Sequence, residues 1–307
     1  MRHINLDIVR VTEAAAIAAS AWIGSGDKLS ADKDATEAMR KRLDQMDFAA
    51  KIVIGEGKKD ESHGLFEGEK VGLLQKNPDS KHYEIAVDPI DGTRPTITAG
   101  PEAMSVLAVA EEGALYSTEE FYMNKLAYGP EIAAKTKLLI TDSLETTVKK
   151  AAIALGKEVP KITVCMLDRP RHDKWVSELR ALGVRIKLIQ DCDVSGSIAA
   201  CLPFSGIDIL YGIGGAPEGV ISACAIKCLR GGFQAQVINK DSLKSPDGKI
   251  LETEDLVRGE CVFAATGITN GSLLKGVRYK GQSPITNSVF MRSESGTVRW
   301  LTAYHGN

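Results

Sequence analysis

The chain has 307 residues, of which 44% are hydrophobic and 25% are charged, and its formal net charge is −2. This composition is typical of a soluble globular protein, with enough length for one large domain or two medium ones. The small net charge argues against a nucleic-acid-binding or membrane-seeking protein. An anionic substrate would therefore have to be held by local cations.

The sequence also points to a reduced, cytoplasmic protein. The N-terminal MRHINLDIVR carries charges and no apolar core of a signal peptide, and no apolar run approaches membrane-spanning length. The six cysteines are scattered, without a paired CxxC arrangement. Cys224 and Cys228 share an apolar helical stripe with Ile221 and Ala225, which favours core packing over metal binding.

The first half of the chain mixes early helices with later strands. Alanine-rich residues 7–22 and residues 31–46 have helical patterns, and the GSGDKLS stretch separates them. Short apolar runs with strand character follow at residues 51–55, 83–87, 104–110 and 121–129.

The second half alternates helix and strand more regularly. Helices are predicted at 144–155, 172–182, 194–202 and 217–229, and strands at 162–167, 185–189, 208–213, 233–238 and 261–268. The polar segment 241–255 is predicted to be a surface excursion. The alternation indicates an α/β fold. We expect a metal-binding N-terminal part, 1–140, and a C-terminal part, 141–307, that completes the active site.

Five acidic residues share a setting where a strand ends or a helix begins: Asp32, Glu56, Asp88, Asp91 and Glu218. Ligand sites of α/β proteins collect at such places, and Mg²⁺ and Mn²⁺ prefer oxygen ligands. Each acid taken alone is more simply explained as a helix cap, a helix-dipole partner or a turn residue. The repeated placement of glycine beside these acids favours a common ligand, because glycine permits close backbone approach.

Thr93 follows the second acid of VDPIDGT and is the candidate catalytic residue. A hydroxyl beside a metal-bound water can orient that water and relay its proton toward phosphoryl transfer. The alternative for Thr93 is an ordinary turn or cap residue. The backbone after Gly92 is expected to open a helical turn near Pro95.

The set of motifs resembles a known enzyme family. VDPIDGT resembles the signature of the lithium-sensitive sugar phosphatase superfamily. WIGSGDKLSAD, IVIGEG, FYMNKLAYGP, LDRPRHD, YGIGGAPEGVISA, FAATGIT and SGTVRWLTAYH together resemble class II fructose-1,6-bisphosphatase. These motifs run in order along nearly the whole chain.

The resemblance implies a layered αβαβα sugar-phosphatase fold, with mixed sheets and helices between and outside them. It implies Mg²⁺- or Mn²⁺-dependent hydrolysis of the 1-phosphate of fructose 1,6-bisphosphate, as in gluconeogenesis. The five acids would be the metal ligands, and Thr93 would activate the water. Substrate contacts would come from Asp91, Gly92, Thr93, Tyr122, Arg169, Pro170, Arg171, Asp191, Cys192, Asp193 and Gly215.

Further expectations come from single positions. Lys28 and Lys125 are possible auxiliary cations, and His172 is interpreted as a surface or capping residue. Cys192 stands where the family usually has glycine, and Pro95 is a second departure beside the proposed catalytic residue. Arg169 and Arg171 are expected to bind the distal phosphate, and the alternative is that they lie at a solvated helix start.

Alternative functions stay open at this stage. The enzyme could also accept sedoheptulose 1,7-bisphosphate, since pocket length is not visible in the sequence. An inositol monophosphatase shares the DPIDGT motif, but the arginine pair and GIGGAPEG argue against it. A non-catalytic sugar-phosphate-binding regulator would have no need of Thr93. The family suggests a homo-oligomer, either a dimer or a tetramer.

Overall fold

The computed structural model describes residues 6–56, 64–117 and 121–306. Its contacts divide the chain into two compact units, Met1–Ser117 with Val257–Asn307, and Thr118–Leu256. The first unit is thus built from both ends of the chain. These units do not coincide with the expected parts 1–140 and 141–307, whose separate roles stay predictions. The predicted α/β class is confirmed, since helices and two mixed sheets make up the described chain.

The first unit contains an eight-stranded sheet. Its elements are α1 (Asp7–Ser20), α2 (Lys28–Leu43), β1 (Ala49–Ile54), β2 (Lys70–Val71), β3 (His82–Asp91), α3 (Thr93–Ile97), β4 (Met104–Glu111), β11 (Cys261–Gly267), β12 (Arg278–Lys280), β13 (Ser283–Arg292) and β14 (Thr297–Tyr304). The strand order is β12-β13-β11-β4-β3-β1-β2, and β14 pairs with β13. Of the described pairs, β1 with β3 is parallel and the others are antiparallel.

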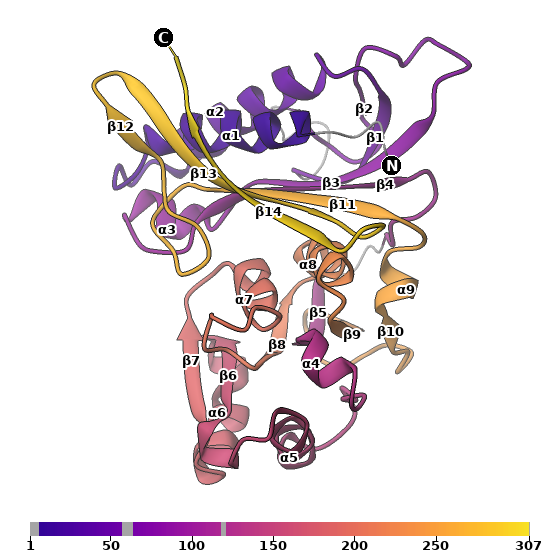
Figure 1. Cartoon of the computed structure of the whole chain (residues 1–307), viewed down its shortest axis with the longest axis vertical. Helices are drawn as coiled ribbons and strands as arrows, with labels where there is room; N and C mark the ends of the chain where they lie inside the picture. Colours follow the sequence, from indigo (N-terminus) through magenta and orange to yellow (C-terminus); the bar gives the residue numbers. More distant parts are fainter. Residues whose placement is uncertain (1–5, 57–63, 118–120, 307) are drawn as a thin grey trace. The chain divides into compact units, whose positions relative to one another are not determined.

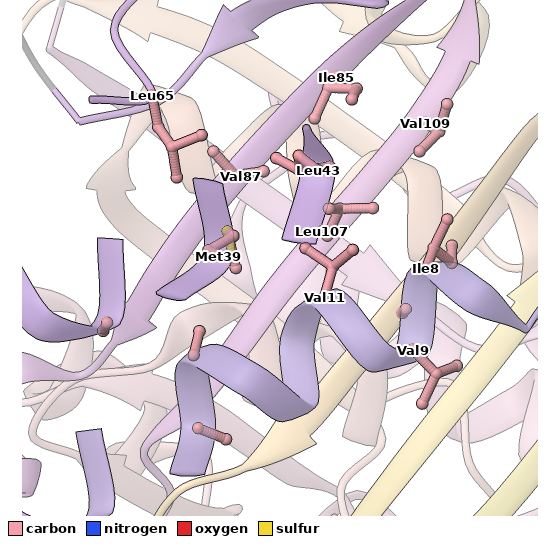
Figure 2. Packing of buried hydrophobic residues seen from close by; sticks show 14 of the residues in the cluster. Ile8, Val9, Val11, Met39, Leu43, Leu65, Ile85, Val87, Leu107 and Val109 are labelled. Carbon is pink, nitrogen blue, oxygen red and sulfur yellow. The ribbon is translucent and has the colours of Figure 1, made fainter. Parts of the chain in front are cut away.

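Two helices cover one face of this sheet (Figure 1). Alanine dominates α1, and its short side chains let the helix lie close against the strands. Asp27 caps α2, because its carboxylate accepts a hydrogen bond from the Ser30 N–H at 3.1 Å. The apolar faces of both helices meet β3 and β4 in one core, and Figure 2 shows Leu107 of β4 among side chains that include Val11 and Leu43.

Strand β3 runs farther than the sequence pattern predicts. Asp88 was expected to end the strand and Asp91 to lie in the turn beyond, but the strand continues to Asp91. Asp88 pairs with Val106 and Asp91 with Met104, so three steps on β3 oppose two on β4. This extra residue is a β-bulge, and Pro89, which has no N–H for the ladder, lies within it.

The second unit contains a six-stranded sheet. Its elements are β5 (Tyr122–Tyr128), α4 (Pro130–Ala133), α5 (Leu144–Leu155), a 3₁₀ turn (Val159–Lys161), β6 (Thr163–Leu167), a second 3₁₀ turn (Pro170–His172), α6 (Asp173–Ala181), β7 (Arg185–Ile189), α7 (Asp193–Ala199), β8 (Ile209–Gly215), α8 (Ala216–Leu229), β9 (Gly232–Ile238), β10 (Leu251–Glu252) and α9 (Thr253–Leu256). The strand order is β10-β9-β5-β8-β6-β7.

Helices pack on both faces of the second sheet. Leu126 and Tyr128 of β5 share a core with α4, α5 and α6. Because side chains alternate along a strand, Met123 and Lys125 point to the other face, where they contact Gly219 of α8. Cys224 and Cys228 are both buried in α8, which confirms the core interpretation of that stripe.

The segment 241–255 behaves partly as predicted. Most of its residues are exposed, as expected for a surface excursion, but its end forms β10 and most of α9. Strands β12, β13 and β14 were not predicted as elements. Each residue of β14 is exposed or half-buried and none is fully buried, so the strand has no strong apolar pattern in the sequence.

We predict that Leu107→Ala lowers the free energy of unfolding by about 2–5 kcal/mol, because Leu107 is fully buried and the truncation leaves a cavity. The same change at Leu29, whose side chain is 81% exposed on α2, removes no core contact and serves as the control. Urea unfolding measured for both variants gives the comparison. Equal losses of stability would contradict the assignment of this core.

Candidate active site

A hydrogen bond joins Thr93 to Asp32 in the first unit. The Thr93 hydroxyl donates to Asp32 Oδ1 at 3.0 Å, although 61 positions separate the two residues. Asp32 lies in the second turn of α2, and Thr93 is the first residue of α3. Gly92 makes this possible, because its φ of 101° turns the chain sharply from β3 into α3, and such a φ favours glycine. The structure thus brings the candidate catalytic residue to a candidate metal ligand.

The surroundings of Asp32 exclude its interpretation as a helix cap. Asp27 caps α2, five residues earlier, and Asp32 lies inside the helix. Partial burial raises the pKa of the Asp32 carboxyl, while the hydrogen bond from Thr93 and the positive charge of Lys28 act in the opposite direction. Lys28 itself is exposed.

Of the other acids of the first unit, Asp91 ends β3 and Glu56 follows β1, whereas Asp88 lies within β3. Asp91 is buried and Asp88 is half-buried, one on each side of the β3 bulge. The Asp88 carboxylate accepts a hydrogen bond from the Ile90 N–H at 3.0 Å. Glu56 follows β1 after Gly55, and its N–H donates to the Leu65 carbonyl at 2.9 Å. These contacts fix the backbone that carries each carboxylate.

The unusual Pro95 has a structural explanation. It is the third residue of α3, where an N–H has no partner within the helix, so proline removes no hydrogen bond. Its ring is buried, and its carbonyl accepts a hydrogen bond from the Gly100 N–H at 2.7 Å. Arg94 beside it is exposed.

A buried ion pair organises the second unit. Lys125 of β5 is fully buried, and its Nζ lies 2.5 Å from Asp193 Oδ2 and donates to the Gly215 carbonyl at 3.0 Å. Asp193 is the first residue of α7 and is also buried. Burial of a lysine ammonium in a core is strongly unfavourable without such partners. Lys125 was expected only as an auxiliary cation.

Glu218 lies beside this ion pair in the first turn of α8. Burial raises the pKa of its carboxyl, the charge of Lys125 lowers it, and the charge of Asp193 raises it further. A Cβ on Gly215 would lie 1.7 Å from Glu218 Oε2, and one on Gly214 would lie 2.0 Å from Asp193 Oδ2. The Gly-Gly pair thus leaves room for the two carboxylates where they lie.

The arginines of the DRPRHD motif are held by specific contacts. Arg169 donates to Asp191 Oδ1 at 2.5 Å. Arg171 donates to the Ile213 carbonyl at 2.6 Å and 3.1 Å, and its guanidinium lies 5.0 Å from the centre of the Tyr122 ring. Partial burial lowers the pKa of Arg171, although the group stays cationic. The structure thus groups four of the predicted substrate-binding residues in two pairs.

The interpretation of His172 as a surface or capping residue is wrong. His172 is fully buried and makes no side-chain capping hydrogen bond to α6. Its ring bridges the Leu167 carbonyl and the Ile213 N–H. Part of its environment, Gly212 and Ile213 of β8, comes from a distant part of the chain, and its local sequence, PRHDK, is polar and gave no signal of burial.

Cys192 adopts a left-handed backbone conformation, with φ 68° and ψ 51°, just before α7. Only glycine adopts this region without steric cost, which explains why a glycine suits this position. Cys192 is also buried, so the turn that carries Asp191 and Asp193 combines strain with tight packing.

The five predicted metal ligands are all described in the structure. Among residues 6–56, 64–117 and 121–306, no three His, Cys, Asp or Glu side chains are grouped closely enough to hold a metal ion. The donor chemistry does fit a hard cation, because all five predicted ligands are carboxylates. Glu218 Oε2 is also shielded from solvent and accepts no hydrogen bond from the described residues. Such an oxygen is suited to a cation.

We predict that Lys125→Met lowers the free energy of unfolding by about 3–5 kcal/mol, because it leaves the Asp193 carboxylate buried without its cation. Lys149→Met is the matched control. Lys149 lies equally near Glu145, at 2.5 Å, but on an exposed face of α5, so its loss costs less than about 1 kcal/mol. Thermal unfolding of both variants checks this. A small effect at Lys125 would contradict the buried pair.

We predict that Cys192→Val lowers the free energy of unfolding by about 1–3 kcal/mol more than Cys165→Val does. Both cysteines are buried, but Cys165 lies in β6, where a β-branched residue is suited to the backbone. At Cys192 valine must adopt a positive φ. Denaturant titration of the two variants measures the difference, and equal losses would exclude backbone strain at Cys192.

Comparison with known proteins agrees with the motifs. The sequence model of the family described as bacterial fructose-1,6-bisphosphatase, glpX-encoded, matches residues 2–305. Fructose-1,6-bisphosphatase 1 class 2 of Escherichia coli K12 is 39% identical over 326 residues, which cover 99% of this chain and 95% of that protein. The class 2 enzymes of Escherichia coli O6:H1 and Shigella flexneri match equally well. The chain therefore belongs to the bacterial class II fructose-1,6-bisphosphatase family.

Proposed function

We propose that this protein hydrolyses the 1-phosphate of fructose 1,6-bisphosphate, giving fructose 6-phosphate and inorganic phosphate in gluconeogenesis. Family membership over nearly the whole chain supports this reaction. The observation that carries it is the hydrogen bond from Thr93 to Asp32, since it orients a hydroxyl beside carboxylates at the end of a bulged strand.

Thr93 would position the attacking water. Because its proton is directed at Asp32, the lone pairs of Oγ1 can accept a hydrogen bond from water. The water oxygen then bonds to phosphorus and gives up one proton, while the bond from phosphorus to the sugar oxygen breaks and that oxygen takes up one proton. Asp91, Gly92 and Thr93 would line the scissile phosphate, because all three belong to the turn from β3 into α3.

The proposed metal ligands are the carboxylates of Asp32, Glu56, Asp88, Asp91 and Glu218, and the proposed cation is Mg²⁺ or Mn²⁺. A bound divalent cation would lower the pKa of water and neutralise charge on the phosphoryl oxygens. The solvent-shielded Glu218 Oε2 supports this role for Glu218. The shape of β3, with one carboxylate on each side of the bulge, supports it for Asp88 and Asp91.

The remaining predicted residues would bind the sugar and the distal phosphate. Arg169 and Arg171 supply the positive charge, and the neighbouring Tyr122 ring restricts the Arg171 guanidinium. Asp191 and Asp193 can accept hydrogen bonds from sugar hydroxyls. Pro170, Cys192 and Gly215 would contribute backbone contacts, while Lys28 would be an auxiliary cation.

Two properties of the protein as a whole are also proposed. The family suggests a homo-oligomer, either a dimer or a tetramer, and a cytoplasmic location. None of the described helices is long and apolar enough to cross a membrane.

We predict that Thr93→Val reduces kcat by about 10²-fold or more, because the water loses its hydrogen-bond partner. The KM for fructose 1,6-bisphosphate should change little, since Arg169 and Arg171, the residues proposed to bind the distal phosphate, stay. Phosphate release is measured with Mg²⁺ and with Mn²⁺. Thr98→Val, at the exposed end of the same turn, is the control and should keep wild-type activity.

Two results would contradict the proposal. Wild-type protein that releases no phosphate from any sugar bisphosphate with either cation would exclude the enzymatic function. Full activity of Thr93→Val would exclude the role of its hydroxyl while leaving the reaction itself in place.

A further inference from the structure

Strands β6 and β8 run parallel but separate before they end. The two strands pair Val164 with Ile209 and Cys165 with Leu210, and the described residues of the two strands form no further pair. Beyond it lie the Leu167 carbonyl on β6 and the Ile213 N–H on β8. Buried backbone groups of this kind need hydrogen-bond partners, so the divergence of the strands has to be compensated.

The ring of His172 provides that compensation. Its Nδ1 lies 2.7 Å from the Leu167 carbonyl oxygen, and its Nε2 accepts a hydrogen bond from the Ile213 N–H at 2.9 Å. A neutral imidazole that carries its proton on Nδ1 satisfies both contacts at once. Burial and the nearby positive charges lower the pKa of His172, which favours this neutral form.

The position of the imidazole is fixed from several sides. It stacks on Trp175 with ring centres 5.4 Å apart, and Trp175 meets the Tyr211 ring edge-on at 5.0 Å. On the remaining side is Gly212, where a Cβ would come within 3.1 Å of His172 Cε1. The ring therefore occupies a closely fitted place between the two strands.

The neighbouring Arg171 contacts the backbone of the same β8 residue, Ile213. Its guanidinium donates to the carbonyl of Ile213, whose N–H is bound by His172. Two consecutive side chains thus hold the backbone donor and acceptor of one residue. Since Arg171 and His172 are consecutive residues of the same short 3₁₀ turn, any movement of His172 away from β8 would also displace Arg171.

We infer that His172 is a positioning residue that holds the arginine loop, Arg169–Arg171, against β8 in the geometry that binds the distal phosphate of the substrate. This inference rests on the proposed function of that loop. It assigns to His172 no contact with the substrate and no part in proton transfer. Its effect is therefore on affinity, through Arg171, and not on the chemical step.

The test uses three variants of the full chain. His172→Phe keeps a ring against Trp175 but loses both hydrogen bonds. His172→Asn keeps a donor for the Leu167 carbonyl but is too short to reach Ile213, whereas His172→Gln places an amide oxygen near the position of Nε2. His82→Phe is the control, because His82 is exposed at the start of β3 in the first unit.

The measurements are kcat and KM for fructose 1,6-bisphosphate, and the affinity for fructose 6-phosphate by calorimetry. For the Phe and Asn variants we expect KM and the dissociation constant of fructose 6-phosphate to rise together by about tenfold or more, with kcat within about threefold. The Gln variant should recover most of the affinity, and His82→Phe should match the wild type.

A folded His172→Phe variant with unchanged affinity for fructose 6-phosphate would overturn the inference, as would a loss confined to kcat. If His172→Phe does not fold, His172→Asn and His172→Gln provide the test. Equal affinities of these two variants for fructose 6-phosphate would overturn the inference. Absence of phosphate release by the wild type would instead count against the proposed function. Calorimetry with fructose 6-phosphate needs no turnover, so the two failures can be told apart.

Discussion

The arrangement of the second unit depends on one buried positive charge. Lys125 cannot be accommodated in the core without compensation, and Asp193 with the Gly215 carbonyl supplies it. Several sequence features then follow. Gly214 and Gly215 leave the space that the carboxylates of Asp193 and Glu218 occupy, and Gly219 lets Lys125 and Met123 lie against α8. Lys125 of β5 thus holds the start of α7 through Asp193 and the start of α8 through the Gly215 carbonyl.

In the first unit, a hydroxyl is placed near carboxylates without a long loop. The bulge in β3 sets the positions of Asp88 and Asp91, and the left-handed Gly92 then turns the chain directly into α3. The hydroxyl of Thr93 meets Asp32 of α2 as a result. The interpretations of this stretch as a turn and as a functional site are therefore compatible, since the backbone irregularity positions the chemistry.

Local signals account for the elements that the sequence predicted well. α5 begins and ends where expected because Ser143 caps it and Gly156 adopts the left-handed conformation after it, and β7 matches its apolar run. α2 begins three residues earlier than predicted, since the cap is Asp27. The burial of Lys125 and His172 was not predictable, because Asp193 and Gly215, which pair with Lys125, and Ile213, which pairs with His172, are distant in sequence. β13 and β14 were missed since their stability comes from pairing with each other and, for β13, with β11.

The discontinuous first unit has a consequence for biosynthesis. α1 packs partly against β11 and β13, which the ribosome makes last, whereas the second unit is one continuous segment. At about 5–20 residues per second, the ribosome needs on the order of tens of seconds to make the chain between α1 and those strands, and the apolar face of α1 stays partly uncovered for that time. Throughout that time Ile8 and Val11 lack part of their final cover. The second unit is made as one continuous segment, whereas the sheet of the first unit can be completed only after β11 and β13 have been made, so the apolar face of α1 is exposed for most of the synthesis of the chain.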